Sequence, residues 1–150
     1  MPQSGAVASG RALLAGKPPP AEAQPRGSDP FCAALGRSDE SLLVDAHGGL
    51  QNVLVRVVEA AGGPYAPPTE PVRLTQAACR YSPRVLGVVR GQPVLVSNSD
   101  GTLHNVHALL GDRTVLNQIQ LNAEAPLIDL RPVTAATRTS PLKLRCDIHP

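Results

Sequence analysis

The chain has 150 residues, and its 14 basic and 12 acidic side chains leave a formal charge of only +2. That length suits one domain with one hydrophobic core, and the weak charge, with no basic run among aromatic residues, excludes the usual nucleic-acid-binding surface. No stretch reaches the roughly 18 apolar residues of a membrane-spanning helix. Sixteen prolines and 13 glycines favour short elements joined by turns, as in all-β proteins.

The N-terminal part of the sequence predicts strands separated by a proline-rich loop. Weak alternation predicts a first strand over residues 5–16, and the prolines exclude regular structure over residues 17–30. A glycine turn at residues 47–49 joins an apolar strand at 41–46 to a β-branched run at 50–59. These two runs predict a hairpin.

The remainder of the chain predicts a β-sandwich. Apolar or β-branched runs between turn signals predict strands at residues 72–74, 85–90, 94–99, 103–110, 114–121, 126–133 and 141–146. No run has the caps and the length of a helix. In the absence of an internal repeat, we expect an all-β fold: a single antiparallel sandwich of about eight to ten strands over residues 1–150.

The last predicted strand carries a cysteine to the buried face of the sandwich. Side chains alternate along a strand, so the leucines and Cys146 share one face while Lys143 and Arg145 take the solvent side. His149 follows three positions later, in a loop that Pro150 stiffens. We therefore expect a thiolate and an imidazole to lie close together.

A second histidine comes from the strand predicted at 103–110. His104 shares a face with Val106 and Ala108, whereas His107 lies an odd number of positions away and faces the opposite side. We expect His104 to be a metal ligand, His107 to be exposed or hydrogen-bonded, and His47 to be a solvated turn residue. One thiolate and two imidazoles with a weak axial ligand form a trigonal set that favours copper. The alternative is that Cys146 packs as a small hydrophobic side chain.

These residues resemble the plastocyanin-like cupredoxins, in particular a bacterial branch of plastocyanin-like or methylamine-utilisation-like proteins. The likeness covers most of the chain. It rests on these motifs, of which the last two are the most specific: Gly16-Lys17-Pro18-Pro19, Asp29-Pro30-Phe31-Cys32, Asn52-Val53, Cys79-Arg80-Tyr81, Asn98-Ser99-Asp100, His104-Asn105-Val106-His107 and Cys146-Asp147-Ile148-His149-Pro150.

The resemblance implies a cupredoxin-like, antiparallel Greek-key β-sandwich that binds one type 1 copper ion. By position, the copper ligands are His104, Cys146 and His149, and Asn105 hydrogen-bonds near the cysteine loop to orient them. Such a protein is an electron carrier and not an enzyme. We expect transient redox partners, with His149, which lies near the surface in such folds, as the electron port.

Two departures from the family pattern stand out. The family usually continues after the proline with a tryptophan, an axial methionine and a final strand, and the sequence given stops at Pro150. We therefore expect a truncated chain without the axial ligand. We expect a monomer, and the open sheet edge would make association possible. The second departure is Arg84, where the family often has histidine.

The other two cysteines have two interpretations. In a secreted sandwich Cys32 and Cys79 would form a disulfide and leave Cys146 as the free thiol; in a reducing compartment they would be unrelated buried thiols. We favour the disulfide and a periplasmic or extracellular location, although residues 1–16 lack a signal-peptide pattern.

Two further functions stay open at this point. One is a copperless β-sandwich that serves as a binding or adhesion module of an exported protein, because sandwiches host many binding roles. The other is copper storage or delivery by an incomplete, exchangeable site.

Overall fold

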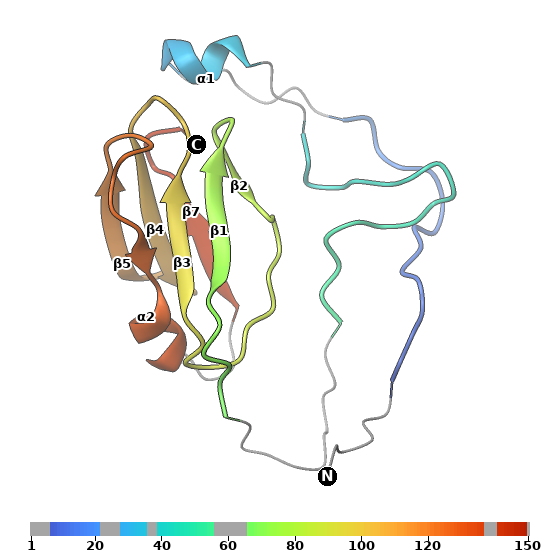
Figure 1. Ribbon diagram of the computed structural model, residues 1–150. Coiled ribbons are helices and arrows are strands. Elements are labelled where there is room, and N and C mark those ends of the chain that lie inside the picture. Colours follow the sequence, from blue (N-terminus) through green and yellow to red (C-terminus); the bar gives the residue numbers. More distant parts are fainter. Residues whose placement is uncertain (1–6, 22–27, 36–38, 56–65, 137–140, 150) are drawn as a thin grey trace.

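The computed structural model describes residues 7–21, 28–35, 39–55, 66–136 and 141–149. Its regular elements within these ranges are seven strands and two short helices (Figure 1). In chain order they are α1 (Pro30–Ala34), β1 (Val72–Ala77), β2 (Arg80–Ser82), β3 (Val94–Asn98), β4 (His104–Leu110), β5 (Arg113–Gln120), β6 (Ile128–Asp129), α2 (Arg131–Ala136) and β7 (Leu142–Arg145).

The strands form two sheets, so the expected all-β class is confirmed. One sheet has the order β2-β1-β3-β6 and the other has the order β5-β4-β7. The expectation of a wholly antiparallel sandwich is wrong in one place, because β1 and β3 are parallel, with Val72 opposite Val94. Parallel neighbours need a crossover, and β2 with residues 83–93 supplies it.

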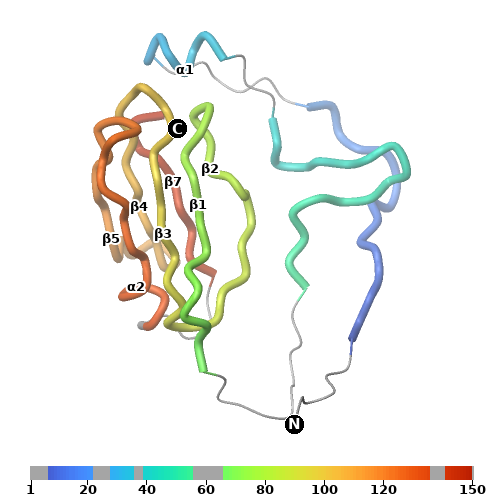
Figure 2. The backbone as a smooth tube through the Cα atoms, viewed as in Figure 1, coloured from blue at the N-terminus to red at the C-terminus, as the bar shows by residue number. Residues whose placement is uncertain are grey.

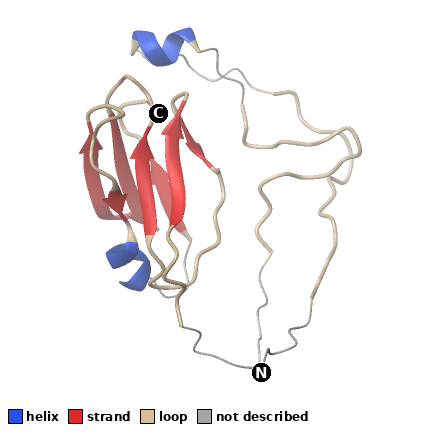
Figure 3. Ribbon diagram, in the orientation of Figure 1, coloured by secondary structure: helices blue, strands red, loops and turns tan. Residues whose placement is uncertain are grey.

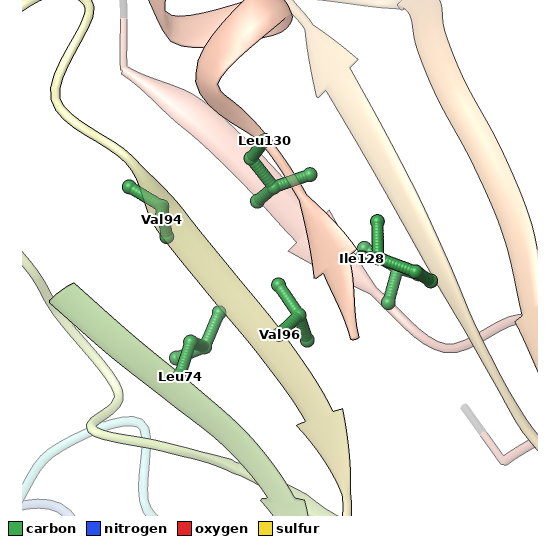
Figure 4. Close-up of a cluster of buried hydrophobic side chains, with 6 residues drawn as sticks. Leu74, Val94, Val96, Ile128 and Leu130 are labelled. Atoms are coloured by element: carbon green, nitrogen blue, oxygen red, sulfur yellow. The ribbon is translucent and has the colours of Figure 1, made fainter. Parts of the chain in front are cut away.

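The hydrophobic core lies between the two sheets. Leu74 of β1 and Val94 and Val96 of β3 point toward Ile128 and Leu130 (Figure 4). Val106 of β4 completes the cluster from the opposite sheet. Val96 and Val106 are fully buried, and burial of such a side chain contributes about 1.5–3 kcal/mol.

Several predicted strands are present. Those expected at 72–74, 94–99, 103–110, 114–121 and 141–146 correspond to β1, β3, β4, β5 and β7. The strand expected at 126–133 is shorter and continues into α2.

Two predicted strands are wrong. Residues 85–90 form no strand, and this valine-rich run lies in the connection that leads from β2 to β3. In the described part of 5–16, only Leu13 makes an isolated bridge, to Gly49. The expected hairpin is reduced to one bridge between Val44 and Leu50, and residues 56–59 lie outside the described ranges.

The two helices were not expected from the sequence, and the side chain of a preceding aspartate accepts a hydrogen bond from the first turn of each. Asp29 accepts hydrogen bonds from the backbone N–H groups of Phe31 (2.8 Å) and Cys32 (3.1 Å), and Pro30 occupies the first helical position. An aspartate cap followed by proline is a favourable helix start. Asp129 accepts from the N–H of Arg131 at the start of α2. The helices lie at opposite ends of the sheets (Figure 3).

The N-terminal segments run outside the sheets. Residues 7–21 and 39–55 follow a path to one side of the sandwich, visible in blue and teal in Figure 2. α1, which lies between them in sequence, covers the end of the sheets at which β3 ends (Figure 1). Among the residues described, no helix is long and apolar enough to cross a membrane.

Candidate metal centre

Strand pairing brings the predicted ligands to one end of the sheets. His104 is the first residue of β4, and Cys146 follows the last residue of β7. These strands are antiparallel neighbours, with His107 opposite Arg145, so the end of β7 meets the beginning of β4. His149 then returns to the same place through a loop of two residues.

The three side chains converge on one point. Nδ1 of His104 lies 3.0 Å from Nδ1 of His149. Sγ of Cys146 lies 3.7 Å from the first of these nitrogens and 3.8 Å from the second. The two rings meet edge to face, with 4.8 Å between their centroids. His104, Cys146 and His149 therefore present one sulfur and two nitrogen donors to a common centre.

This triangle of donor atoms has the size of a metal coordination plane. A metal about 2.0 Å from each nitrogen and about 2.3 Å from the sulfur, with bonds about 120° apart, would hold the sulfur about 3.7 Å from each nitrogen and the two nitrogens about 3.5 Å from each other. The two sulfur–nitrogen distances match the first of these values. The shorter nitrogen–nitrogen distance corresponds to a bond angle of about 100°. The donor set fits a single transition-metal ion.

A carboxylate lies behind each imidazole. Nε2 of His104 is 2.8 Å from Oδ2 of the buried Asp100. Nε2 of His149 is 3.5 Å from Oδ2 of Asp29, and it is a buried nitrogen without a hydrogen-bond partner among the described residues. We treat the second contact as electrostatic. A carboxylate on Nε2 favours the proton there and leaves the Nδ1 lone pair for a metal.

The surroundings of Cys146 favour the thiolate. Burial raises the pKa of this thiol, but hydrogen bonds from His104 and from the backbone of Asn105, Ile148 and His149 outweigh it and bring the pKa to about 6. Burial lowers the pKa of His104, and contacts with Cys146 and Asp100 reverse the direction and raise it. A thiolate is the form of cysteine that binds metals.

Asn105 contacts the cysteine loop, where the sequence places it. Its Oδ1 accepts a hydrogen bond from the backbone N–H of Asp147 (2.7 Å), and its Nδ2 donates to Asn117 (2.7 Å) and to the carboxylate of Asp147 (3.1 Å). Side-chain hydrogen bonds, that from His107 foremost, lower the pKa of Asp147 to about 2. The loop between Cys146 and His149 is thus tied to β4 and β5.

The other histidines take no part in the triangle. His107 is buried on the opposite face of β4, where Nδ1 lies 3.0 Å from the carboxylate of Asp147 and Nε2 lies 2.7 Å from the hydroxyl of Thr114. His47 is exposed in a turn, where its backbone N–H donates to Asp45.

His149, expected near the surface, is a buried residue. Only 4% of this residue is exposed, because the segment that begins α1 and carries Asp29 lies against it. Cys146 is the most exposed of the three candidate ligands. A cavity of about 340 Å³ reaches all three, and Arg80, Arg84 and Arg145 are among the residues that line it.

Cys32 and Cys79 form a disulfide, and Cys146 is a free thiol. Two further groups of potential ligands contain one of the bridged cysteines: Asp29 with Cys32 and His149, and Cys79 with Asp100 and His104. A bridged sulfur is not a thiolate ligand. These groups are therefore the surroundings of the first triangle and not separate sites.

Sequence reasoning missed three residues that support the site. Asp29 and Asp100 stand behind the imidazoles, and Tyr81 of β2 donates its hydroxyl to the carbonyl groups of Asn105 (3.0 Å) and Arg145 (3.3 Å). Burial raises the pKa of this tyrosine, so it remains a donor. The helix-cap pattern at Asp29-Pro30 was the one local signal that could have located a helix here.

Comparisons with protein-family models, with curated proteins and with solved structures find no match to this chain.

Proposed function

We propose that this protein binds one copper ion through His104, Cys146 and His149 and works as a cupredoxin-like one-electron carrier. The observation that carries the proposal is the triangle of one sulfur and two Nδ1 atoms at 3.0, 3.7 and 3.8 Å. One thiolate with two imidazoles in a plane is the donor set of copper electron-transfer sites, in which an axial ligand is weak and long.

Copper in such a site supplies a one-electron change between Cu(I) and Cu(II). The residues contribute a fixed frame. His104 is 1% exposed and hydrogen-bonded through Nε2, and Asn105 holds the loop that carries Cys146. A frame that does not rearrange between two oxidation states keeps the reorganisation energy small, which suits electron transfer.

The burial of His149 changes the expected route for electrons. With both imidazoles buried, the shortest path to a partner runs past Cys146, through the opening lined by Arg80, Arg84 and Arg145. Partners would dock there weakly and transiently over a small surface. The disulfide is of the kind that persists in the periplasm or outside the cell, which supports that location.

Titration with Cu(II), followed by visible absorption, tests the proposal. We expect one copper per chain and an intense thiolate-to-copper charge-transfer band. Cys146→Ser is expected to abolish the band, and His47→Ala, which changes the exposed turn histidine, is expected to leave it unchanged. A colourless protein without bound copper would contradict the carrier function and favour a copperless binding module. Bound copper that exchanges freely and does not cycle would favour storage or delivery.

A further inference from the structure

We propose that Asp29 and Asp100 are positioning residues of the metal centre, and that the Cys32–Cys79 disulfide sets the place of both. Each carboxylate faces Nε2 of one ligand histidine. Each is also hydrogen-bonded to the backbone N–H of one bridged cysteine. The inference rests on the proposed function, because it concerns the same three ligands.

Asp100 joins His104 to the segment that carries Cys79. Its Oδ1 accepts from the N–H of Ala78, and its Oδ2 accepts from the N–H of Cys79, each at 2.8 Å. Ala78 and Cys79 have φ angles of 51° and 57°, a left-handed turn of the kind that joins short hairpins. The same Oδ2 lies 2.8 Å from Nε2 of His104. One buried carboxylate therefore holds both the turn and the imidazole.

Asp29 performs the corresponding task for His149. Its Oδ1 caps α1 through the N–H groups of Phe31 and Cys32. Its Oδ2 accepts a hydrogen bond from the hydroxyl of Thr102 (3.0 Å) and lies 3.5 Å from Nε2 of His149. The carboxylate that caps α1 therefore also lies next to the imidazole of His149.

The disulfide connects the two carboxylates. It joins residues 47 positions apart and holds their Cα atoms 5.8 Å from each other. A helix of five residues such as α1 does not persist in isolation, so the place of Asp29 depends on the bond that anchors this helix to the β1–β2 turn. Both imidazoles are thus oriented by one covalently closed unit.

The consequence for metal binding is a fixed tautomer and a fixed charge. A proton held on Nε2 by a carboxylate leaves Nδ1 free to bind the ion, and removal of such a partner costs about 10–100-fold in metal affinity. Two anionic groups behind the ligands also favour the more positive oxidation state of the metal, so their loss should raise the reduction potential.

Zinc affinity of the purified full chain, measured by chelator competition, tests the positioning role without copper chemistry. We expect Asp100→Asn to bind Zn²⁺ about 10–100-fold more weakly, and Asp29→Asn to show a smaller loss in accord with its longer contact. Asparagine can still cap α1, so the second variant isolates the contact with His149. Asp129→Asn is the matched control, because Asp129 also accepts at a helix start, on α2 at the other end of the sheets (Figure 3). It should bind zinc like the wild type.

Two readouts separate positioning from general stability. Nitrogen-15 NMR of the zinc-loaded protein should show a slowly exchanging Nε2 proton on His104 in the wild type and in Asp129→Asn, and faster exchange of this proton in Asp100→Asn. With copper bound, Asp100→Asn should have a higher reduction potential than the control. Unchanged exchange of the Nε2 proton, unchanged reduction potential and unchanged zinc affinity in Asp100→Asn would overturn the proposal.

The disulfide is tested by Cys32→Ser/Cys79→Ser. We expect this double variant to lose zinc affinity, and we expect Asp29→Asn to cause little further loss in that background, because coupled groups are not additive. A folded double variant with wild-type affinity would overturn the role of the bond. If the wild type binds zinc and copper but the aspartate variants match Asp129→Asn, this inference fails and the proposed function stands. A wild-type protein that binds neither metal would contradict both this inference and the proposed function.

Discussion

At the scale of single residues, the site separates two histidines that stand only three positions apart. His104 and His107 lie on opposite faces of β4, and each is buried. His104 presents Nδ1 to Cys146, whereas both ring nitrogens of His107 are engaged by Asp147 and Thr114. The alternation of side chains along a strand decides which of them lies beside Cys146 at the candidate site.

His107→Ala tests this separation. The variant leaves the hydrogen-bonding groups of Asp147 and Thr114 without their partner, so we expect a loss of about 1–3 kcal/mol in the free energy of unfolding. The copper charge-transfer band should remain, because the three donors are intact. His104→Ala should abolish the band. Urea unfolding and copper titration of both variants check this, and a colourless His107→Ala that remains folded would contradict the assignment.

The residues that meet at the candidate site could be predicted from the sequence, and their surroundings could not. Strand alternation alone indicates that Cys146 and His104 face the core. The contacts of Asp100 with His104 and of Asp29 with His149 depend on how loops far apart in the chain fold back. No local pattern encodes such distances, and the burial of His149 under the start of α1 was hidden for the same reason.

At the scale of elements, the residues of β3 that face inward determine the position of the hydrophobic core. Its residues alternate between buried and partly buried positions, and Val94 and Val96 face the core. Leu130, which follows β6, is 1% exposed in the same cluster. Its backbone N–H donates to the carbonyl group of Val94, so the segment that leads into α2 is fixed to the sheet.

Leu130→Ala measures the contribution of this packing. Loss of a buried leucine side chain should lower the free energy of unfolding by about 2–5 kcal/mol. Leu127→Ala is the control, because Leu127 is 47% exposed and should change the stability by no more than about 0.5 kcal/mol. Urea unfolding of the two variants and the wild type gives the free energy of unfolding, and the dependence of this free energy on urea concentration is recorded for each. Equal effects of the two variants would contradict the described core.

The strands that could be predicted are those whose apolar residues find a partner strand. β3, β4 and β5 combine β-branched or apolar runs with neighbours on the sheet. Residues 85–90 are also rich in valine but form no strand in the connection between β2 and β3, so β-propensity alone overestimates the number of strands. The parallel pairing of β1 with β3 could not be anticipated, because sequence runs do not state which strands become neighbours.

At the scale of the whole molecule, the disulfide connects a segment outside the sheets to the end that carries the candidate site. α1 is held to the β1–β2 turn by Cys32 and Cys79. A loop of 47 residues closed in this way should stabilise the chain by about 4 kcal/mol through the lost entropy of the unfolded state. The covalent bond therefore replaces packing that so short a helix cannot supply.

Acidification should destabilise the molecule through carboxylates that hold its turns. Backbone hydrogen bonds lower the pKa of Asp39, Asp45 and Asp129 below the usual 3.8. A group whose pKa is lower in the folded state stabilises it above the unfolded value and loses that contribution as the pH falls through the folded value. We expect the urea concentration at the midpoint of unfolding to decrease as the pH is lowered below about 4. The double variant Asp45→Asn/Asp129→Asn should show a weaker dependence of the urea midpoint on pH. An unchanged dependence would contradict the role of these carboxylates.

We propose that His104, Cys146 and His149 hold one copper ion. X-ray absorption at the copper edge of the loaded protein measures the ligands directly. The expected result is one short copper–sulfur contact and two imidazole nitrogens, in keeping with the triangle of donors at 3.0, 3.7 and 3.8 Å, with the sulfur contact absent in Cys146→Ser. A copper environment of nitrogen and oxygen alone in the wild type, or no bound copper, would contradict it.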